Sequence, residues 1–445
     1  METVMYSVKI KEHSKVFAQT VALYRAAVDF FTNVIYREWE QFVSVMTSKQ
    51  AVNLTENLTV STASHPSVPY SFSTRFYKFP SYLRRAAIAE AYGKVSSYYS
   101  HFASWKMSDP KTRGGRPVLG KTGFIYPAMY RYNCFVRTGT YTAKLKVFVR
   151  NTWDWISVKL RKSDVDYIRR HCASFKECVP TLQKRGKQWY LDFAFQYKTD
   201  LHKIPVSDQT ILAVDLGINN CCTCAVMRSD GAVIGRYFLK LPKEYDCLKR
   251  KINRIRYAQC HGSHNVHNLW RLADGVNKDI ASKTAAFIVD TAVQYNADTV
   301  VFEYLDLTGK KRGSKKQRLS LWRAKDIQSI VENRCHRFGM RISRICAWGT
   351  SKYAVDGSGK VLRGKDSTKT NGSYSVCEFS TGKVYNCDLN ASYNIGARYF
   401  IREILKSLSV TEEQRILANV PACAKRSTCT LSDLISLHAA LYAEA

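Results

Sequence analysis

The sequence has no run of about 18 consecutive apolar residues, the minimum that a membrane-spanning helix needs. Residues 1–12 are mixed and charged, unlike the apolar centre of a secretory signal peptide. In the absence of such a signal, the fourteen cysteines are not expected to form a disulfide framework. The sequence therefore argues against membrane-embedded and secreted classes, and we expect a cytoplasmic protein.

Acidic residues are scarce relative to basic ones. Asp and Glu total 36, whereas Lys and Arg total 68, which gives a formal net charge of +32. Such an excess repels itself in the compact state, so a partner of opposite charge is the natural explanation. A nucleic acid fits best, because each phosphate that a cation neutralises releases condensed counterions. An anionic membrane fits less well, since no single basic amphipathic helix dominates the sequence.

The first half of the chain predicts a mostly β unit with helices inserted into it. An alternating strand over Val4–Ile10 is followed by helical spacing of apolar residues from Val21 to Ile35 and over Tyr82–Phe102. Residues 52–75 are rich in Ser, Thr and Pro, which predicts a loop. Strand patterns then cover Tyr141–Val149, Trp155–Leu160, Val179–Gln183 and Trp189–Tyr197.

The second half alternates between strand and helix patterns. This alternation predicts an α/β layer with a mixed sheet. The predicted strands are Ile211–Val214, Ala225–Met227, Val233–Leu239, Thr299–Phe302 and Arg341–Cys346. The predicted helices are Leu248–Gln259, Ala281–Tyr295, Leu321–Phe338 and Leu389–Leu405, followed by a helical tail over residues 407–445.

Three acidic residues stand at the ends of these elements. Asp215 and Glu303 each follow a buried strand, and Asp388 opens a helix. Functional groups of α/β sheets gather at the carboxyl ends of strands, and three carboxylates gathered there tolerate one another only around a cation. A few hard oxygen ligands suit Mg²⁺ or Mn²⁺, and two such ions can promote phosphodiester hydrolysis.

Each acid also has a purely structural interpretation. An acid at a strand end is often the first polar residue outside the core, and Asp at a helix start is often its N-terminal cap. A single one of these acids would favour the structural interpretation, so the local sequence around each member decides.

The local sequences resemble the three motifs of RuvC-like nuclease domains. Ala213-Val214-Asp215-Leu216-Gly217-Ile218-Asn219 resembles the first, Val301-Phe302-Glu303-Tyr304-Leu305 the second, and Asp388-Leu389-Asn390-Ala391-Ser392-Tyr393-Asn394-Ile395 the third. With Lys352 after Thr350-Ser351, the set resembles the TnpB family of transposon-encoded RNA-guided endonucleases and the compact type V CRISPR effectors. The resemblance is strong over residues 208–400, looser over 1–207 and absent over 407–445.

The resemblance implies an α/β RNase H-like (RuvC) nuclease domain with a ribbon-like insert, preceded by a β-barrel-like wedge domain that a helical recognition domain interrupts. The implied boundaries are wedge 1–14 and 121–207, recognition domain 15–120, nuclease 208–346 and 385–406, insert 347–384, and helical tail 407–445.

The resemblance also implies an RNA-guided, Mg²⁺-dependent endonuclease that cleaves double-stranded DNA beside a short flanking motif. Asp215, Glu303 and Asp388 would be its catalytic ligands for two Mg²⁺ or Mn²⁺ ions, and a guide RNA and an R-loop its partners. Nucleic-acid contacts are expected from basic loop and helix residues, namely Lys310, Lys311, Arg312, Lys315, Lys316, Arg318, Arg84, Arg85, Arg113 and Arg116. The basic loop 310–325 is equally compatible with a merely solvated segment.

The insert departs from the family pattern of two Cys-x-x-Cys pairs. Tyr353 and Asp356 occupy the first two cysteine positions, and Ser380 stands where the mate of Cys377 is expected. One thiolate cannot hold structural zinc. We therefore expect an insert without zinc, packed around Tyr353, Tyr374, Phe379 and Tyr385.

Two other functions compete with the guided nuclease. Relatives that lose the acids act as guided repressors, so the chain could be a catalytically silent RNA-guided DNA-binding protein, although its acids are intact. An unguided resolvase or transposase could use the same nuclease fold, although such an enzyme needs no long basic and aromatic N-terminal half.

Overall fold

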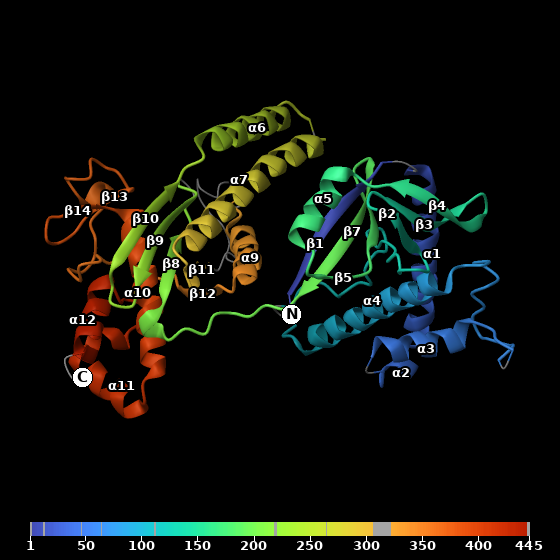
Figure 1. Ribbon diagram of the computed structural model, residues 1–445, viewed down its shortest axis with the longest axis horizontal. Helices are drawn as coiled ribbons and strands as arrows, with labels where there is room; N and C mark the ends of the chain where they lie inside the picture. Colours follow the sequence, from blue (N-terminus) through green and yellow to red (C-terminus); the bar gives the residue numbers. More distant parts are fainter. Residues whose placement is uncertain are drawn as a thin grey trace. The chain divides into compact units, whose positions relative to one another are not determined.

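The computed structural model describes residues 2–11, 14–45, 47–63, 65–110, 113–217, 220–263, 265–305 and 322–442. The chain divides into two compact units, residues 1–198 (unit 1) and 199–445 (unit 2) (Figure 1). None of the described helices is both long enough and apolar enough to cross a bilayer.

Unit 1 contains two antiparallel sheets. The first joins β1 (Glu2–Ile10), β5 (Lys176–Glu177), β6 (Thr181–Arg185) and β7 (Gln188–Tyr197), and the second joins β2 (Phe135–Gly139), β3 (Thr142–Val149) and β4 (Thr152–Lys159). Strand β1 pairs along its whole length with β7, from Glu2 opposite Tyr197 to Ile10 opposite Trp189. The first strand therefore closes against the last one, and the prediction of a β unit interrupted by helices is confirmed.

The helices of unit 1 pack on these sheets through one continuous apolar core. They are α1 (Ser14–Arg37), α2 (Trp39–Phe42), α3 (Ser48–Thr59), α4 (Ser81–Met107) and α5 (Lys162–His171). The predicted apolar stripe of α1 is buried, with Phe31 and Ile35 fully inaccessible in the same cluster as Leu191 and Phe193 of β7. Apolar burial of this kind supplies the main favourable free energy of folding.

One prediction in unit 1 was wrong, and one helix was not predicted. The expected loop 52–75 begins inside α3, which Thr47 and Gln50 start with a reciprocal capping box. The buried hydroxyls of Thr55 and Thr59 bond to the carbonyl four residues earlier, so a Thr-rich segment is compatible with a helix here. Helix α5 was not predicted, because Val165 and Ile168 are its only buried residues and form too narrow a stripe.

Unit 2 is built around a five-stranded mixed sheet in the order β10–β9–β8–β11–β12. Strands β8, β9 and β10 are antiparallel neighbours, whereas β8, β11 and β12 run parallel. The strands are β8 (Thr210–Asp215), β9 (Cys222–Arg228), β10 (Val233–Leu239), β11 (Thr299–Tyr304) and β12 (Arg341–Cys346). This sheet confirms the predicted α/β layer with mixed pairing.

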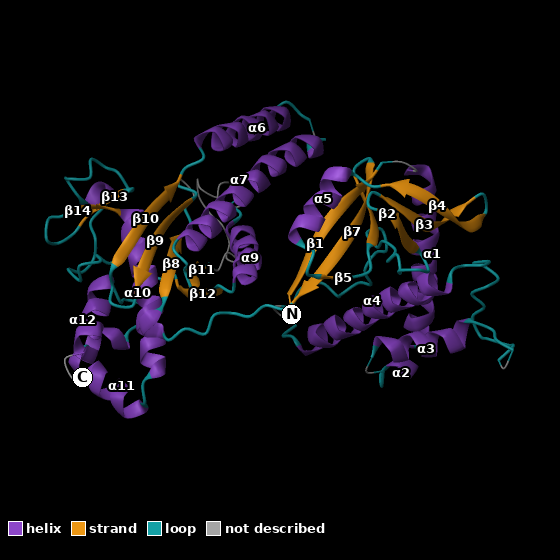
Figure 2. Ribbon diagram, viewed as in Figure 1, coloured by secondary structure: helices purple, strands orange, loops and turns teal. Residues whose placement is uncertain are grey.

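Helices cover both faces of this sheet (Figure 2). Along β8, Ile211 and Ala213 face one side, where α10 packs, while Leu212 and Val214 face the other, where α7 and α9 pack. The two-residue period of the strand sorts these side chains between the layers. The helices are α6 (Pro242–Cys260), α7 (His267–Gln294), α9 (Ala324–Cys335) and α10 (Cys387–Ser407), followed by α11 (Val410–Asn419) and α12 (Leu431–Tyr442).

The insert between β12 and α10 contains one short hairpin, β13 (Val376–Glu378) with β14 (Val384–Asn386). Its core is formed by Ala354, Cys377, Phe379 and Cys387, with Tyr385 partly buried against them. The prediction is confirmed for Phe379 and Tyr385 but wrong for Tyr374, which is 66% exposed. Tyr353 instead packs beside Trp348. The centre of the insert thus combines two thiols with the ring of Phe379, whereas the ring of Tyr374 lies outside it.

Helix α10 approaches the sheet closely at Gly396. A Cβ atom added there would lie 2.3 Å from Sδ of Met227 and 3.3 Å from Cβ of Ala213, both of which are fully buried. We predict that Gly396→Ala lowers the free energy of unfolding by about 1–3 kcal/mol, because the buried side chains cannot move aside freely.

The matched control is Gly275→Ala in α7, where an added Cβ meets no atom within 4 Å. That change should stabilise the protein by up to about 1 kcal/mol through helix propensity. Urea unfolding of both variants measures the difference, and equal stabilisation by both substitutions would contradict the proposed close packing.

Candidate active site

Asp215 and Glu303 lie beside each other at the carboxyl ends of neighbouring strands. Strands β8 and β11 are parallel, and their register places Val214 opposite Phe302, one residue before each acid. Parallel strands end at the same edge of a sheet, so both carboxylates are presented there. Both residues are half-buried, whereas the residues before them are fully buried.

Asp388 reaches the same edge from the first turn of α10. The N-terminal cap of this helix is Asn386, whose side-chain oxygen accepts hydrogen bonds of 3.0 Å from the backbone N–H groups of Asp388 and Leu389. The carboxylate of Asp388 is thus not needed as the cap, so the capping interpretation does not apply to this residue.

The charges of Glu303 and Asp388 act on Asp215. The pKa of Asp215 is raised well above its ordinary value. The main cause is desolvation of its carboxylate by burial, and the negative charges of Glu303 and Asp388 add to it. Burial also raises the pKa of Glu303. Like charges in poorly solvated surroundings favour either a bound proton or a bound cation. The sequence-predicted trio is therefore brought together at one edge of the sheet.

Polar side chains that the sequence analysis did not identify hold two of these acids. The amide of Asn220 donates to Oδ2 of Asp388, and the buried hydroxyl of Thr350 donates to Oε1 of Glu303. Asn220 directly follows the first motif and Thr350 begins the Thr-Ser-Lys triplet, but neither position alone signals a contact to an acid.

Arg398 is a buried cation near Glu303. It is 4% exposed, it lowers the pKa of Glu303, and its own pKa is lowered by burial. Its guanidinium donates to the carbonyls of Cys429 at 3.0 Å and of Trp348 at 2.8 Å. Arg398 therefore joins α10 to the start of the insert and to the segment just before α12. Its position in the sequence gave no recognisable signal of this role.

Among the residues that the structure describes, no three His, Cys, Asp or Glu side chains stand close enough together to hold a metal ion. Asn220 and Thr350 occupy one oxygen each of Asp388 and Glu303. The donor set nevertheless suits Mg²⁺, because it offers hard carboxylate oxygens and leaves positions for water. In the insert, Cys377 and Cys387 form a hydrogen-bonded thiol pair.

The predicted nucleic-acid contacts have different surroundings. Arg84 and Arg85 both contact Glu56, at 2.7 and 3.3 Å. Arg113 lies over the ring of Trp105 at 4.0 Å, and Arg116 lies over that of Phe102 at 4.9 Å. The basic residues expected between 310 and 318 lie outside the described part of the chain. Nucleic-acid binding by these side chains stays a prediction.

Comparisons with known proteins identify relatives of both units. The Aq_aa04 family matches residues 2–149. The uncharacterized protein aq_aa04 of Aquifex aeolicus (strain VF5) is 30% identical over 125 residues, which cover 25% of this chain and 69% of that protein. The TnpB-like protein aq_aa05 of the same strain is 27% identical over 244 residues, which cover 48% of this chain and 74% of that protein.

A solved structure shares the general fold. The cryo-EM structure of a Cas12f1–sgRNA–target DNA complex contains a chain that matches with a TM-score of 0.54 at 15% identity, over 86% of this chain and 81% of the other. The sequence matches and this fold agree with the motif resemblance. The chain therefore belongs to the Aq_aa04 family, and it is similar to a TnpB-like protein in sequence and to the Cas12f1 chain in fold.

Proposed function

We propose that this protein is an RNA-guided, Mg²⁺-dependent endonuclease that cleaves double-stranded DNA through an R-loop next to a short flanking motif. The observation that carries the proposal is the acid trio, in which Glu303 and Asp388 raise the pKa of Asp215 at one edge of the sheet. Repulsion between these like charges destabilises the folded protein, and a functional site that binds cations would account for it.

Asp215, Glu303 and Asp388 would hold the metal ions. When bound, two Mg²⁺ ions would activate a water for attack on phosphorus and stabilise the leaving oxygen. Thr350 orients Glu303 through its hydroxyl, and Asn220 orients Asp388 through its amide. These contacts restrict the rotamers of the acids before substrate arrives, which lowers the entropic cost of assembling the site.

A guide RNA and target DNA are the proposed partners. Support comes from the similar Cas12f1 chain, which was solved with sgRNA and target DNA, and from the net charge of +32. Within the proposed recognition domain 15–120, cations and aromatic rings alternate at the end of α4, where Arg113 and Arg116 cover Trp105 and Phe102. Such surfaces bind unpaired bases and phosphates together.

A catalytically silent RNA-guided DNA-binding protein is the second candidate. The observation that favours it is that the three acids, which all lie in the described part of the chain, are not close enough together to bind one metal ion as a group. Cleavage assays separate the two candidates, because both predict RNA and DNA binding and only the first predicts cutting.

We predict that Asp215→Asn abolishes cleavage and leaves nucleic-acid binding intact. The loss should be on the order of 100-fold or more, as for other groups that stabilise transition-state charge. The assay offers plasmid carrying a matching target to protein purified with its RNA, in Mg²⁺. Asp208→Asn, an exposed acid just before β8, is the control and should cut normally. Full cutting by Asp215→Asn would disprove the site.

The same variant should change the pH dependence of stability in metal-free buffer. The pKa of Asp215 is raised in the folded state, so the folded protein binds more protons than the unfolded one at pH values above about 4. Stability contributed by the protonated acid is therefore lost as the pH rises. We predict that Asp215→Asn is more stable than the wild type at pH 7 and that Mg²⁺ reduces this difference.

Thermal unfolding between about pH 4 and 8 measures the effect, since the unperturbed pKa of Asp lies near 3.9. Asp208→Asn should follow the wild-type curve throughout. Parallel curves for the wild type and Asp215→Asn would show that the acid titrates normally.

Thr350→Val should raise the pKa of Glu303, because the hydroxyl that favours the charged carboxylate is lost. The acidic limb of the pH–activity profile is expected to move to higher pH. At pH values on that limb, activity should fall roughly fivefold, which corresponds to the loss of about 1 kcal/mol for one hydrogen bond. Thr350→Ser keeps the hydroxyl and should restore the profile. An unchanged profile for Thr350→Val would mean that this contact does not orient Glu303.

A further inference from the structure

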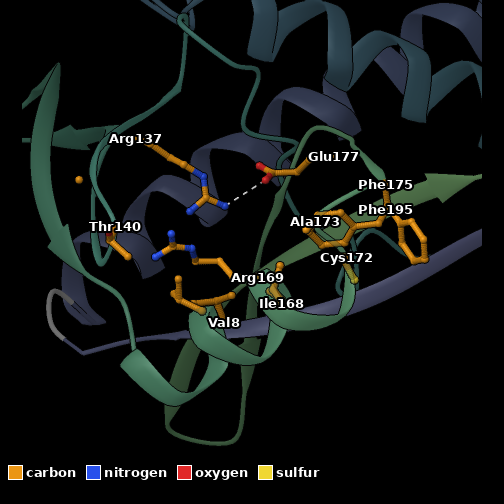
Figure 3. Close-up of a pocket in the computed structure, with 12 residues that line it drawn as sticks. Val8, Arg137, Thr140, Ile168, Arg169, Cys172, Ala173, Phe175, Glu177 and Phe195 are labelled. Carbon is orange, nitrogen blue, oxygen red and sulfur yellow. Dashed lines mark hydrogen bonds and ion pairs between the residues drawn. The ribbon is translucent and has the colours of Figure 1, made fainter.

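Unit 1 contains a cavity of about 320 Å³ that the proposed nuclease site does not use (Figure 3). It lies between α5, the turn between β2 and β3, and strands β1, β5 and β7. Its lining includes Arg137, Thr140, Arg169, Ala173, Phe175 and Glu177. This volume is at the lower end of the range of about 300–1,000 Å³ for small-molecule pockets, so it admits one small group and excludes a helix.

The floor of the cavity is apolar. Val8 of β1, Val165 and Ile168 of α5, and Phe195 of β7 are all buried there. Phe175 stands at the wall, and its ring is supported by the ring of Tyr197, which stacks on it at 4.5 Å and 16°. An apolar, rigid floor of this kind favours a flat, weakly hydrated group such as an aromatic ring.

The rim of the cavity is cationic. Figure 3 shows the side chains of Arg137, from β2, and Arg169, from α5, turned toward the cavity. Glu177 is the one acid in the lining, and it is shared by Arg137 at 3.1 Å and Arg131 at 2.8 Å. Arg169 forms no ion pair with any described residue. Two guanidinium groups thus share one carboxylate, and that of Arg169 adds a further positive charge, which leaves an excess of positive charge at the rim.

The acids of α5 do not neutralise this charge, because they have other partners. Asp164 accepts a hydrogen bond from the backbone N–H of Lys9 and an ion pair from Arg161, and Asp166 accepts from the hydroxyl of Tyr141. Neither acid lines the cavity. Thr140 adds a neutral hydrogen-bonding group to the rim.

We propose that this cavity binds one phosphate-bearing nucleoside, as an unpaired nucleotide of the bound RNA. The aromatic base would lie on the apolar floor, and Arg169 and Arg137 would bind the phosphate at the rim, where guanidinium groups bind phosphate with two parallel hydrogen bonds. The identification of the source as RNA rests on the proposed function, whereas the ligand class rests on the cavity itself. A free nucleotide is the alternative source.

The test uses the full-length protein and the RNA extracted from its purified complex. Arg169→Gln removes the unpaired cation, and Ala173→Phe fills the rim from an exposed position without altering charge. Arg170→Gln is the matched control, since Arg170 is the next residue of α5, carries the same charge and does not line the cavity. Arg169→Lys tests whether charge alone suffices. Each variant must unfold at the wild-type temperature.

We expect Arg169→Gln and Ala173→Phe each to weaken RNA binding on the order of tenfold, in line with a lost charge-assisted contact. Arg170→Gln should have only the small effect of one surface charge, and Arg169→Lys should lie between. RNA carrying 4-thiouridine should crosslink within residues 162–177 in the wild type and not in Ala173→Phe. The proposal would be overturned if Arg169→Gln and Ala173→Phe both bound RNA with the same affinity as Arg170→Gln.

Adenosine and uridine 5′-monophosphate, titrated without RNA, distinguish the two sources. If the wild type binds no RNA, the proposed function fails, and the cavity is decided by these nucleotides alone. If the wild type then binds a nucleotide and Ala173→Phe does not, the cavity is a nucleotide site whose ligand is a free nucleotide. Binding of neither RNA nor nucleotide would overturn the cavity as a site.

Discussion

The close packing of α10 on the sheet of unit 2 is the constraint on which the nuclease-like site depends. Gly396 lets the helix axis approach Met227 and Ala213, and the residues between Leu389 and Leu405 are consequently almost all buried. This seating brings Asp388, at the first turn, to the edge where β8 and β11 end. It also creates the surface on which the C-terminal helices pack, through Leu434 and Leu437 of α12.

The same packing explains why Arg398 is tolerated in the interior. Its guanidinium satisfies backbone carbonyls from two different segments and lies near the negative charge of Glu303. A buried cation without such partners would be strongly destabilising. The two strand-end acids have no such compensation overall, because burial raises the pKa of both Asp215 and Glu303. The fold thus places carboxylates whose charged forms are disfavoured at one edge of the sheet, where the proposed metal ions would stabilise them.

Unit 1 solves a different physical problem. Its first strand, β1, pairs with β7, which lies almost the whole unit later in the chain. The helices inserted between them pack in a single apolar core that they share with both sheets. The cationic rim of its cavity and the arginine-covered rings near α4 place positive charge on apolar surfaces, which is the combination that single-stranded nucleic acid binds.

The sequence by itself determined the main elements and the three acids. Strand periodicity located β8 and β11, and the motif around Asp388 identified its helix, because these signals are local. It failed at α3 and α5, where side-chain hydroxyl bonds and a narrow apolar face replace the usual pattern. Only the tertiary structure decided that Asn220 and Thr350 bond to two of the acids, that Arg398 lies near Glu303, and that Arg169 lines a cavity. Those contacts join residues far apart in the chain, and no local spacing encodes which distant side chains will meet.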